Sequence, residues 1–174
     1  MILINTGNGK GKTSSAIGVA IRSLGWNKKV AIVHFDKGGS HYGEQNIFNL
    51  LQDKIKVYRF GESRFNEKTK TFRFENNKKD IQEAQQAIKK IYKLFKEDYF
   101  LIIADEIITS IQSKLLEEKD VLELINSCPK NCHFMLTGRF ASKKIIEKAD
   151  LVSEIKEVKH YFKKGVNAIK GIDY

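Results

Sequence analysis

The stretch that decides the fold is TGNGKGKT, residues 6–13, which follows the apolar run MILIN and leads into the helical pattern of residues 12–24. Its glycines let the loop curl so that backbone N–H groups point inward as an anion nest, and the helix adds the positive end of its dipole. In such a loop Lys12 reaches the phosphates of a nucleotide and the Thr13 hydroxyl binds Mg²⁺. The stretch departs from the usual G-x-x-x-x-G-K-[ST] pattern, because Thr6 stands at the first glycine position.

Two other apolar runs end in residues that could serve the same site. Residues 99–104 end at Asp105-Glu106, and a carboxylate at such a strand end can hold Mg²⁺ directly or through water. Residues 132–137 end at Gly138-Arg139, and a guanidinium suits bidentate contact with phosphate. The alternatives are an ordinary acidic pair at a strand end and, for Arg139, a structural salt bridge.

Apolar runs alternate with amphipathic stretches along the whole chain. We expect strands over residues 1–5, 29–35, 54–60, 99–104, 132–137 and 151–158, and helices over 12–24, 44–52, 80–96, 117–127 and 142–148. Strands that are apolar on both faces and alternate with helices specify a parallel sheet covered on each side. The sequence therefore predicts an α/β fold with three α/β/α layers, a mainly parallel sheet and a RecA-like P-loop NTPase architecture, in a single domain over residues 1–174. Ligands of such sheets bind at the carboxyl ends of the strands, where every polar cluster named above falls.

The segment of residues 61–80 has the weakest pattern. It is polar and highly charged with isolated aromatics, which is typical of a disordered loop or of a functional lid. The helix predicted after it has an apolar stripe formed by Ile81, Ala84, Ala87, Ile88, Ile91 and Leu94 or Phe95.

The composition, with 41% hydrophobic and 30% charged residues, is typical of a soluble globular protein. No segment approaches the ~18–20 apolar residues that cross a bilayer, and the N-terminus lacks the pattern of a secretory signal, so we expect a cytoplasmic protein. Cys128 and Cys132 fit a reducing compartment. Their spacing, without a second pair, is a poor zinc signature, so core thiols at a strand entrance are the favoured interpretation.

The formal net charge of +10 favours anionic partners but does not choose among them. Lysines scattered over predicted helices indicate a solvated face. A nucleic-acid-binding module is a second hypothesis, for which only residues 59–74 interleave basic and aromatic side chains. A third is that the basic surface receives an acidic electron donor such as a flavodoxin.

Taken together, the motifs resemble the P-loop type of ATP:corrinoid adenosyltransferase, and the shortened loop is that family's own variant. The resemblance covers nearly the whole chain. The further matches are Arg22-Ser23-Leu24-Gly25, Val33-His34-Phe35-Asp36-Lys37-Gly38, Gly43-Glu44 with Asn46, Ala104-Asp105-Glu106-Ile107, Thr137-Gly138-Arg139, Ala149 to Glu154, Val158-Lys159-His160, Gly165-Val166 and Gly171-Ile172-Asp173-Tyr174.

The resemblance implies transfer of the 5′-deoxyadenosyl group from ATP to the Co(I) of a reduced corrinoid, with release of triphosphate, in adenosylcobalamin biosynthesis or salvage. ATP would lie reversed in the loop, which exposes its C5′ atom. The implied ligands are ATP, Mg²⁺ or Mn²⁺, and cobalamin or a precursor. A homodimer is implied as well, and neither a membrane nor a nucleic acid is an expected partner. No general base is needed, because Co(I) supplies the electrons.

The expected site residues fall into three groups. Those expected to act in catalysis are Lys12, Thr13 and Arg139; those expected to hold the metal are Thr13, Asp105 and Glu106; those expected to bind ATP or the corrinoid are Gly7, Asn8, Gly9, Lys10, Gly11, Lys12, Thr13, Ser14, Arg22 and Phe65. For Arg22 the alternative is a solvent-facing helix arginine. Phe65 is the candidate aromatic for displacing the lower axial ligand of the corrinoid.

Two departures from the family pattern concern how the corrinoid is enclosed. Relatives often carry a segment before the first strand, whereas this sequence starts at the strand, and Phe140 replaces the glycine that follows Thr-Gly-Arg. A different P-loop enzyme, such as a nucleoside kinase or a small ATPase, is the alternative function. It would release ADP, whereas the transferase would release triphosphate.

Overall fold

The sheet at the centre of the molecule contains six parallel strands. A computed structural model describes residues 1–36, 43–51, 53–62, 65–66, 71–73 and 75–174. Across the sheet the strand order is β3-β2-β6-β7-β1-β8, and every pair of neighbours is parallel. The strands are β1 (Ile2–Thr6), β2 (Val30–His34), β3 (Ile55–Arg59), β6 (Leu101–Asp105), β7 (His133–Thr137) and β8 (Leu151–Glu154).

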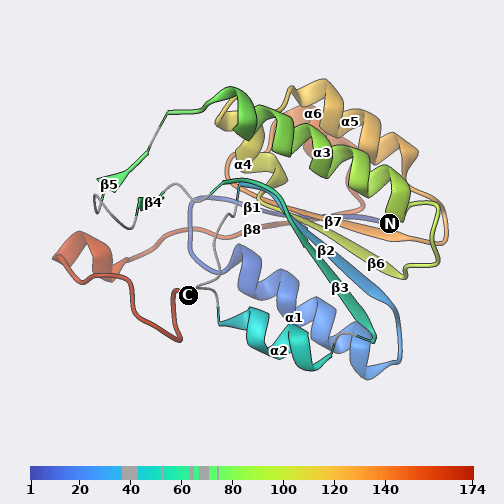
Figure 1. The fold of residues 1–174 in the computed structure, drawn as a ribbon, viewed down its shortest axis with the longest axis horizontal. Coiled ribbons are helices and arrows are strands. Elements are labelled where there is room, and N and C mark those ends of the chain that lie inside the picture. Colours follow the sequence, from blue (N-terminus) through green and yellow to red (C-terminus); the bar gives the residue numbers. More distant parts are fainter. Residues whose placement is uncertain (37–42, 52, 63–64, 67–70, 74) are drawn as a thin grey trace.

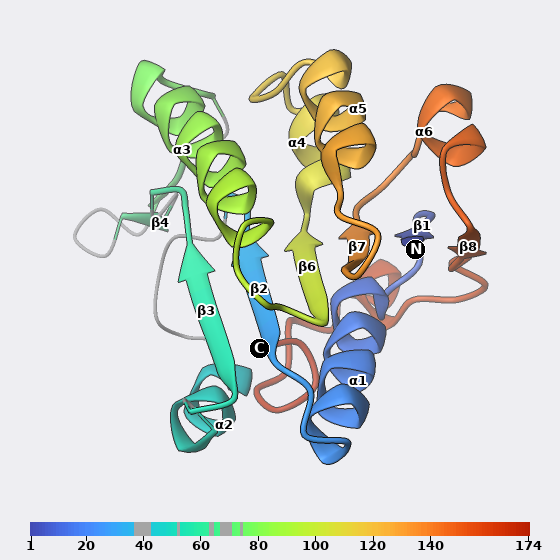
Figure 2. The same ribbon diagram turned by 90° about the vertical axis from the view of Figure 1, so that its right-hand side faces the viewer.

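Helices cover both faces of this sheet. Helices α1 and α2 lie on one side and α3, α4, α5 and α6 on the other (Figure 1; Figure 2). The helices are α1 (Lys12–Gly25), α2 (Glu44–Leu50), α3 (Lys78–Leu94), α4 (Ile107–Gln112), α5 (Glu118–Ser127) and α6 (Lys143–Glu147), and a short 3₁₀ helix, η1, spans Tyr161–Lys164. The predicted three-layer α/β/α fold is confirmed, and the sheet is entirely parallel.

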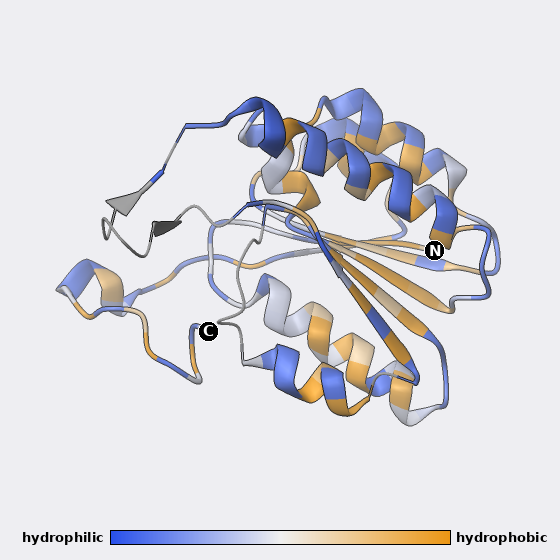
Figure 3. Cartoon of the chain, viewed as in Figure 1, coloured by the Kyte–Doolittle hydropathy of each residue, from blue (hydrophilic) through white to orange (hydrophobic). Residues whose placement is uncertain are grey.

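Strand β6 explains why the strands read as unbroken apolar runs. Successive side chains of a strand point to opposite faces. Ile102 and Ala104 therefore enter the core under α3, α4 and α5, whereas Leu101 and Ile103 enter the core under α1 and α2. All of them are buried, because helices cover both faces. Figure 3 shows the same apolar strands between helices with polar outer faces.

The predicted elements recur, with differences in single helices and strands. Helix α4, directly after β6, was missed, because its six residues are too few to show a helical period. Helix α3 begins at Lys78, because Asn77 and Asp80 form a capping box ahead of the apolar stripe. The predicted stripe residue Ile81 was wrong, since its side chain is 43% exposed in the first turn.

Within the weakly patterned segment, a short antiparallel pair forms, β4 (Phe65–Asn66) with β5 (Thr71–Phe72). Residues 37–42, 52, 63–64, 67–70 and 74 lie outside the described residues, and they include Lys37 and Gly38 of the family match.

After β8 the chain crosses the carboxyl ends of the strands, turns at η1, and returns so that the C-terminus lies beside the first turns of α1 and α2 (Figure 1). Strand β8 was predicted to reach residue 158 but ends at Glu154, and all four of its residues are exposed at the edge of the sheet. Within the described ranges, none of the helices has the length and apolar content to cross a bilayer.

Candidate functional site

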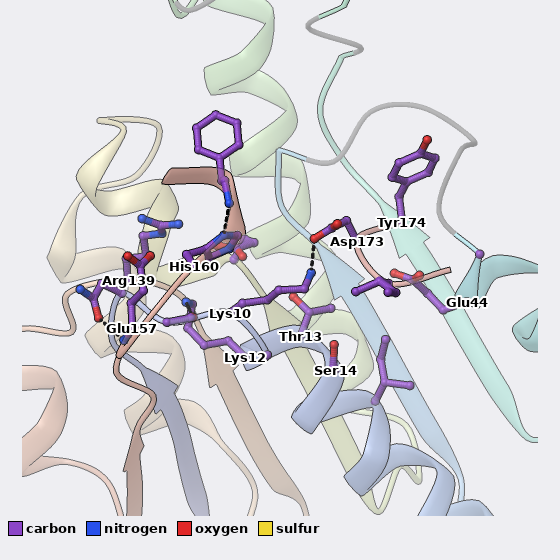
Figure 4. A pocket seen from close by; sticks show the side chains of 18 of the residues that line it. Lys10, Lys12, Thr13, Ser14, Glu44, Arg139, Glu157, His160, Asp173 and Tyr174 are labelled. Carbon is purple, nitrogen blue, oxygen red and sulfur yellow. Dashed lines mark hydrogen bonds and ion pairs between the residues drawn. The ribbon is translucent and has the colours of Figure 1, made fainter. Parts of the chain in front are cut away.

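A pocket of about 950 Å³ opens at the carboxyl ends of the strands, between the glycine-rich loop and the C-terminal segment (Figure 4). The loop and the start of α1 form one wall, with residues 8–14 and Ile17. Other lining residues come from distant parts of the chain. They are Gly43, Glu44, Glu106, Arg139, Glu157, His160, Phe162, Lys163 and residues 171–174.

The loop is anchored from behind, by the segment that follows β8. Gly7 has a φ of +102°, and a Cβ there would lie 2.3 Å from the carbonyl oxygen of Ile155. Only glycine permits this approach. The N–H of Gly9 donates to the same carbonyl at 2.8 Å, and the Thr6 hydroxyl accepts from the N–H of Ala141 at 3.0 Å. Threonine at the first glycine position thus ties the loop to the chain beyond β7.

The first turn of α1 presents its amides to the pocket. Gly11, with a φ of +114°, precedes the helix, and no side chain caps it. The first N–H groups of a helix have no partner in a preceding turn, so this end can receive an anion. The Lys12 side chain is buried, and its Nζ donates to the carbonyl of Gly9 at 2.7 Å. Burial lowers the pKa of Lys12, and the Glu106 carboxylate opposes that shift.

Beneath the loop, Asp105 collects hydrogen bonds from three elements. Its Oδ1 accepts from the hydroxyls of Thr13 at 2.8 Å and Thr137 at 2.7 Å. Its Oδ2 lies 2.9 Å from Nδ1 of His34, which stands opposite Asp105 in the register of β2 and β6. Asp105 is 1% exposed and His34 3%. Because the Thr13 hydroxyl donates its proton to Asp105, its oxygen can act toward a ligand only as an acceptor.

Glu106 differs from Asp105, because it lines the pocket. Its φ of +64° is in the left-handed region and turns the chain from β6 into α4. Its N–H donates to the Thr137 hydroxyl at 2.9 Å, and its carboxylate accepts from the Thr109 hydroxyl. The Thr109 hydroxyl also accepts from the N–H of Arg139 at 3.0 Å, so the strand ends that carry Glu106 and Arg139 are bonded together.

The comparison with known proteins identifies the family. The model of the ATP:corrinoid adenosyltransferase BtuR/CobO/CobP family matches residues 1–174. The chain belongs to this family. A corrinoid adenosyltransferase of Pseudomonas aeruginosa is 35% identical over 175 residues, which are 100% of this chain and 83% of the relative. The corrinoid adenosyltransferase CobA of Salmonella typhimurium is 33% identical over 177 residues, and that of Escherichia coli K12 is 32% identical over 175; each alignment takes in all of this chain and 85% of the relative.

Within this adenosyltransferase family member, most residues that the sequence assigned to one site do lie together. Asn8, the loop from Gly9 to Ser14, Glu106 and Arg139 all line the pocket. Gly7 lies behind the loop, and the Gly9 amide is bonded to Ile155 rather than directed at a ligand.

Two further predicted site residues, Arg22 and Asp105, do not line the pocket. Arg22 is exposed in the last turn of α1, ten residues and about 15 Å along the helix axis from Lys12, outside the pocket lining. Asp105 is enclosed and does not line the pocket, so its place in the structure is that of a residue that orients Thr13. Phe65 stands in β4, and its role in corrinoid binding stays a prediction.

The chemistry of the donors at this edge suits a hard divalent cation. A carboxylate on Glu106 and a hydroxyl on Thr13 are oxygen ligands of the kind that Mg²⁺ takes, with the rest supplied by water and phosphate. Over the described ranges, no three His, Cys, Asp or Glu side chains gather closely enough to hold a metal by themselves. Cys132 is buried and Cys128 half-buried, both as free thiols.

The tail wall of the pocket, formed by His160, Phe162, Lys163 and residues 171–174, was not predicted from the sequence. Lys10 Nζ lies 2.6 Å from Oδ1 of Asp173, and backbone atoms of Tyr174 lie within 4 Å of a Cβ built on Gly43. The available signal was the Gly-Ile-Asp-Tyr ending itself, a distinctive match to the family to which no role was assigned. His34 had a signal as well, because it ends the strand beside the one that ends at Asp105.

Proposed function

We propose that this protein transfers the 5′-deoxyadenosyl group of ATP to the Co(I) centre of a reduced corrinoid. The observation that carries the proposal is the pocket lined by the glycine-rich loop, in a chain matched by the adenosyltransferase family over its full length. The Co(I) electron pair forms the bond to C5′, the bond from C5′ to oxygen breaks, and the triphosphate leaves with that electron pair.

In this reaction the protein's task is to bind the polyphosphate and stabilise its charge as the C5′–O bond breaks. The Lys12 ammonium and the amides at the start of α1 face the pocket from one side, and Arg139 lies at its rim. Preorganised cations and N–H donors at the position where charge develops lower the barrier most effectively. Burial lowers the pKa of Lys12, and a bound polyphosphate would raise that pKa and hold the ammonium charged.

Mg²⁺ or Mn²⁺ would be held by Thr13 and Glu106, with Asp105 orienting the threonine hydroxyl from below. When bound, such a cation neutralises charge on the phosphate oxygens. The contribution of this chain is a fixed hydroxyl, a carboxylate at the pocket wall, and a buried network that keeps both in place.

Product analysis tests the proposal directly. The protein is incubated with ATP, Mg²⁺ and chemically reduced cobalamin, and the corrinoid absorbance and the phosphate products are followed together. Adenosylcobalamin and triphosphate in equal amounts are the expected result. ADP and orthophosphate with unchanged corrinoid would instead indicate a kinase or an ATPase. Lys12→Met is the matched inactive variant, and Lys119→Met, on the exposed face of α5, removes the same charge outside the pocket.

The remaining assignments are also proposals and rest on the family resemblance and the composition. They are a cytoplasmic location, a homodimer, and reduction of the corrinoid by a flavodoxin-like donor that the net charge of +10 would attract. Sedimentation gives the oligomeric state. Donor binding should weaken as salt rises, since it depends on exposed charges.

A further inference from the structure

Asp173 joins the C-terminal segment to the glycine-rich loop. Its Oδ1 lies 2.6 Å from Nζ of Lys10. The Tyr161 hydroxyl lies 2.6 Å from both carboxylate oxygens, and the N–H of Ile169 donates to Oδ2 at 2.7 Å. One carboxylate therefore binds η1, the last turn of the chain and the loop, and Figure 4 shows Asp173 beside Lys10 at the pocket.

The contact between Asp173 and Lys10 lies in a C-terminal segment that is otherwise exposed to solvent. From residue 161 to 174 only Tyr161 and Asp173 are partly buried, and every other residue is exposed. The side chain of Asp173 is 15% exposed and that of Lys10 38%. The Ile169 N–H first, then Lys10 and Tyr161, hold the pKa of Asp173 below its usual value, so the carboxylate is ionised at neutral pH.

The geometry leaves Lys10 able to serve two partners. An ammonium group has three N–H donors and no acceptor, and Asp173 uses one of them. A flexible lysine on a loop pays side-chain entropy to reach a ligand, and a partner that already holds the side chain lowers that cost. Lys10 lines the same pocket as Lys12, at the end where the tail closes it.

We propose that Asp173 is a positioning residue, which holds the Lys10 ammonium in the pocket so that its remaining donors meet the polyphosphate of ATP. Tyr161 and the Ile169 N–H fix the Asp173 carboxylate, and the C-terminal segment therefore contributes to binding of the ligand. This inference rests on the proposed function, because it assumes a polyphosphate in the pocket.

A double-mutant cycle on nucleotide binding tests it. Binding of ATP with Mg²⁺, inorganic triphosphate and adenosine is measured by calorimetry for the wild type, Asp173→Asn, Lys10→Met and the double variant. We expect the affinity for ATP and for triphosphate to fall about tenfold in Lys10→Met and about fivefold in Asp173→Asn. The double variant should be no weaker than Lys10→Met, and adenosine should bind all four alike. Tyr161→Phe should lower the affinity for ATP and triphosphate about twofold, because Asp173 keeps its other partners.

Other outcomes would overturn the inference. Tighter triphosphate binding by Asp173→Asn would mean that the carboxylate competes with phosphate for Lys10. Additive losses of affinity would mean that the two residues act separately. An equal loss of affinity for adenosine would mean that the C-terminal segment only shapes the pocket and does not position Lys10. Glu118→Gln, which makes the same change of carboxylate to amide at the pair with Lys144, outside the pocket lining, is the control and should bind like the wild type. If the wild type binds neither ATP nor triphosphate, the proposed function fails with the inference; if it binds both and Asp173→Asn binds equally well, only the inference fails.

Discussion

The two walls of the pocket are built in opposite ways. The sheet wall, formed by the loop and the first turn of α1, lies on a buried network in which Thr13, Thr137 and His34 all bond to Asp105. The tail wall is a largely solvent-exposed segment, and the Asp173 carboxylate connects it to the loop. The first wall is therefore fixed by the fold, whereas the second depends on a few polar contacts with solvent close by. Loss of a residue from that buried network should cost stability, and loss from the tail wall should cost ligand affinity.

Lys12→Met should have the largest effect on the reaction. Lys12 is the one lysine of the loop whose side chain is buried within the sheet wall, with Nζ on the Gly9 carbonyl. Loss of a preorganised charge at a developing anion lowers kcat by about 100- to 1,000-fold. Steady-state kinetics of adenosyl transfer measure this loss, and circular dichroism checks the fold. A loss of activity below tenfold would show that the phosphate charge is met mainly elsewhere in the pocket.

His34→Leu should destabilise the protein by about 1–3 kcal/mol, because it leaves Oδ2 of the buried Asp105 without this donor. His34→Asn should recover most of the loss, since its amide can donate from the position of Nδ1. Urea denaturation gives the free energy of unfolding of each variant.

His133→Leu is the matched control for His34. This histidine begins β7, at the opposite end of the sheet, and its buried Nδ1 has no hydrogen-bond partner within the described part of the chain. Burial lowers the pKa of His133, and leucine in its place loses no hydrogen bond of Nδ1 to a described residue while still packing against Phe100. We expect equal or slightly higher stability. If both leucine variants lose stability equally, the contact of His34 with Asp105 is not the cause.

The same contrast explains how far the sequence could predict the site. Motifs at strand ends placed Lys12, Thr13, Glu106 and Arg139 at one edge, because parallel strands carry their carboxyl ends to the same side. The separate roles of Asp105 and Glu106 were not predictable in this way. They depend on the left-handed turn at Glu106, which directs one carboxylate into the network and the other into the pocket.

The order and type of the main strands and helices followed from apolar patterns, since both faces of the central strands β2 and β6 are buried. Contacts between distant segments could not be predicted by the same reasoning. Asp173 lies at the far end of the chain from Lys10, and no local pattern relates the two. The motif that assigned Arg22 to the site carries no information on its distance from Lys12 along α1. The structure puts the Arg22 side chain outside the pocket.

The titration of Asp173 tests how the tail wall is held. The Ile169 N–H is the largest cause of its lowered pKa, followed by Lys10 and Tyr161. A carboxylate whose pKa is lower in the folded protein adds stability above its unfolded pKa of about 3.9, and that stability is lost as pH falls through the folded pKa. The ¹³C chemical shift of the Asp173 carboxyl should therefore change only in acid well below pH 4. In Lys10→Met the midpoint should rise partway, since the Ile169 N–H remains, and a wild-type midpoint near 3.9 would contradict the contact.

The smallest expected effect lies at Phe140, which follows Arg139 on the surface. Phe140 replaces the family's glycine, and the structure gives it a φ of +58°, with 62% of the side chain exposed. The left-handed region costs a residue with a Cβ about 1–2 kcal/mol, and the greater freedom of glycine in the unfolded chain cancels about 0.5–1 kcal/mol of that. Phe140→Gly should therefore raise the free energy of unfolding by up to about 1 kcal/mol, as measured in urea. Phe140→Ala separates the two causes, because it removes the ring but keeps the Cβ, so it should gain nothing. Equal gains from alanine and glycine would assign the effect to the exposed ring rather than to the backbone.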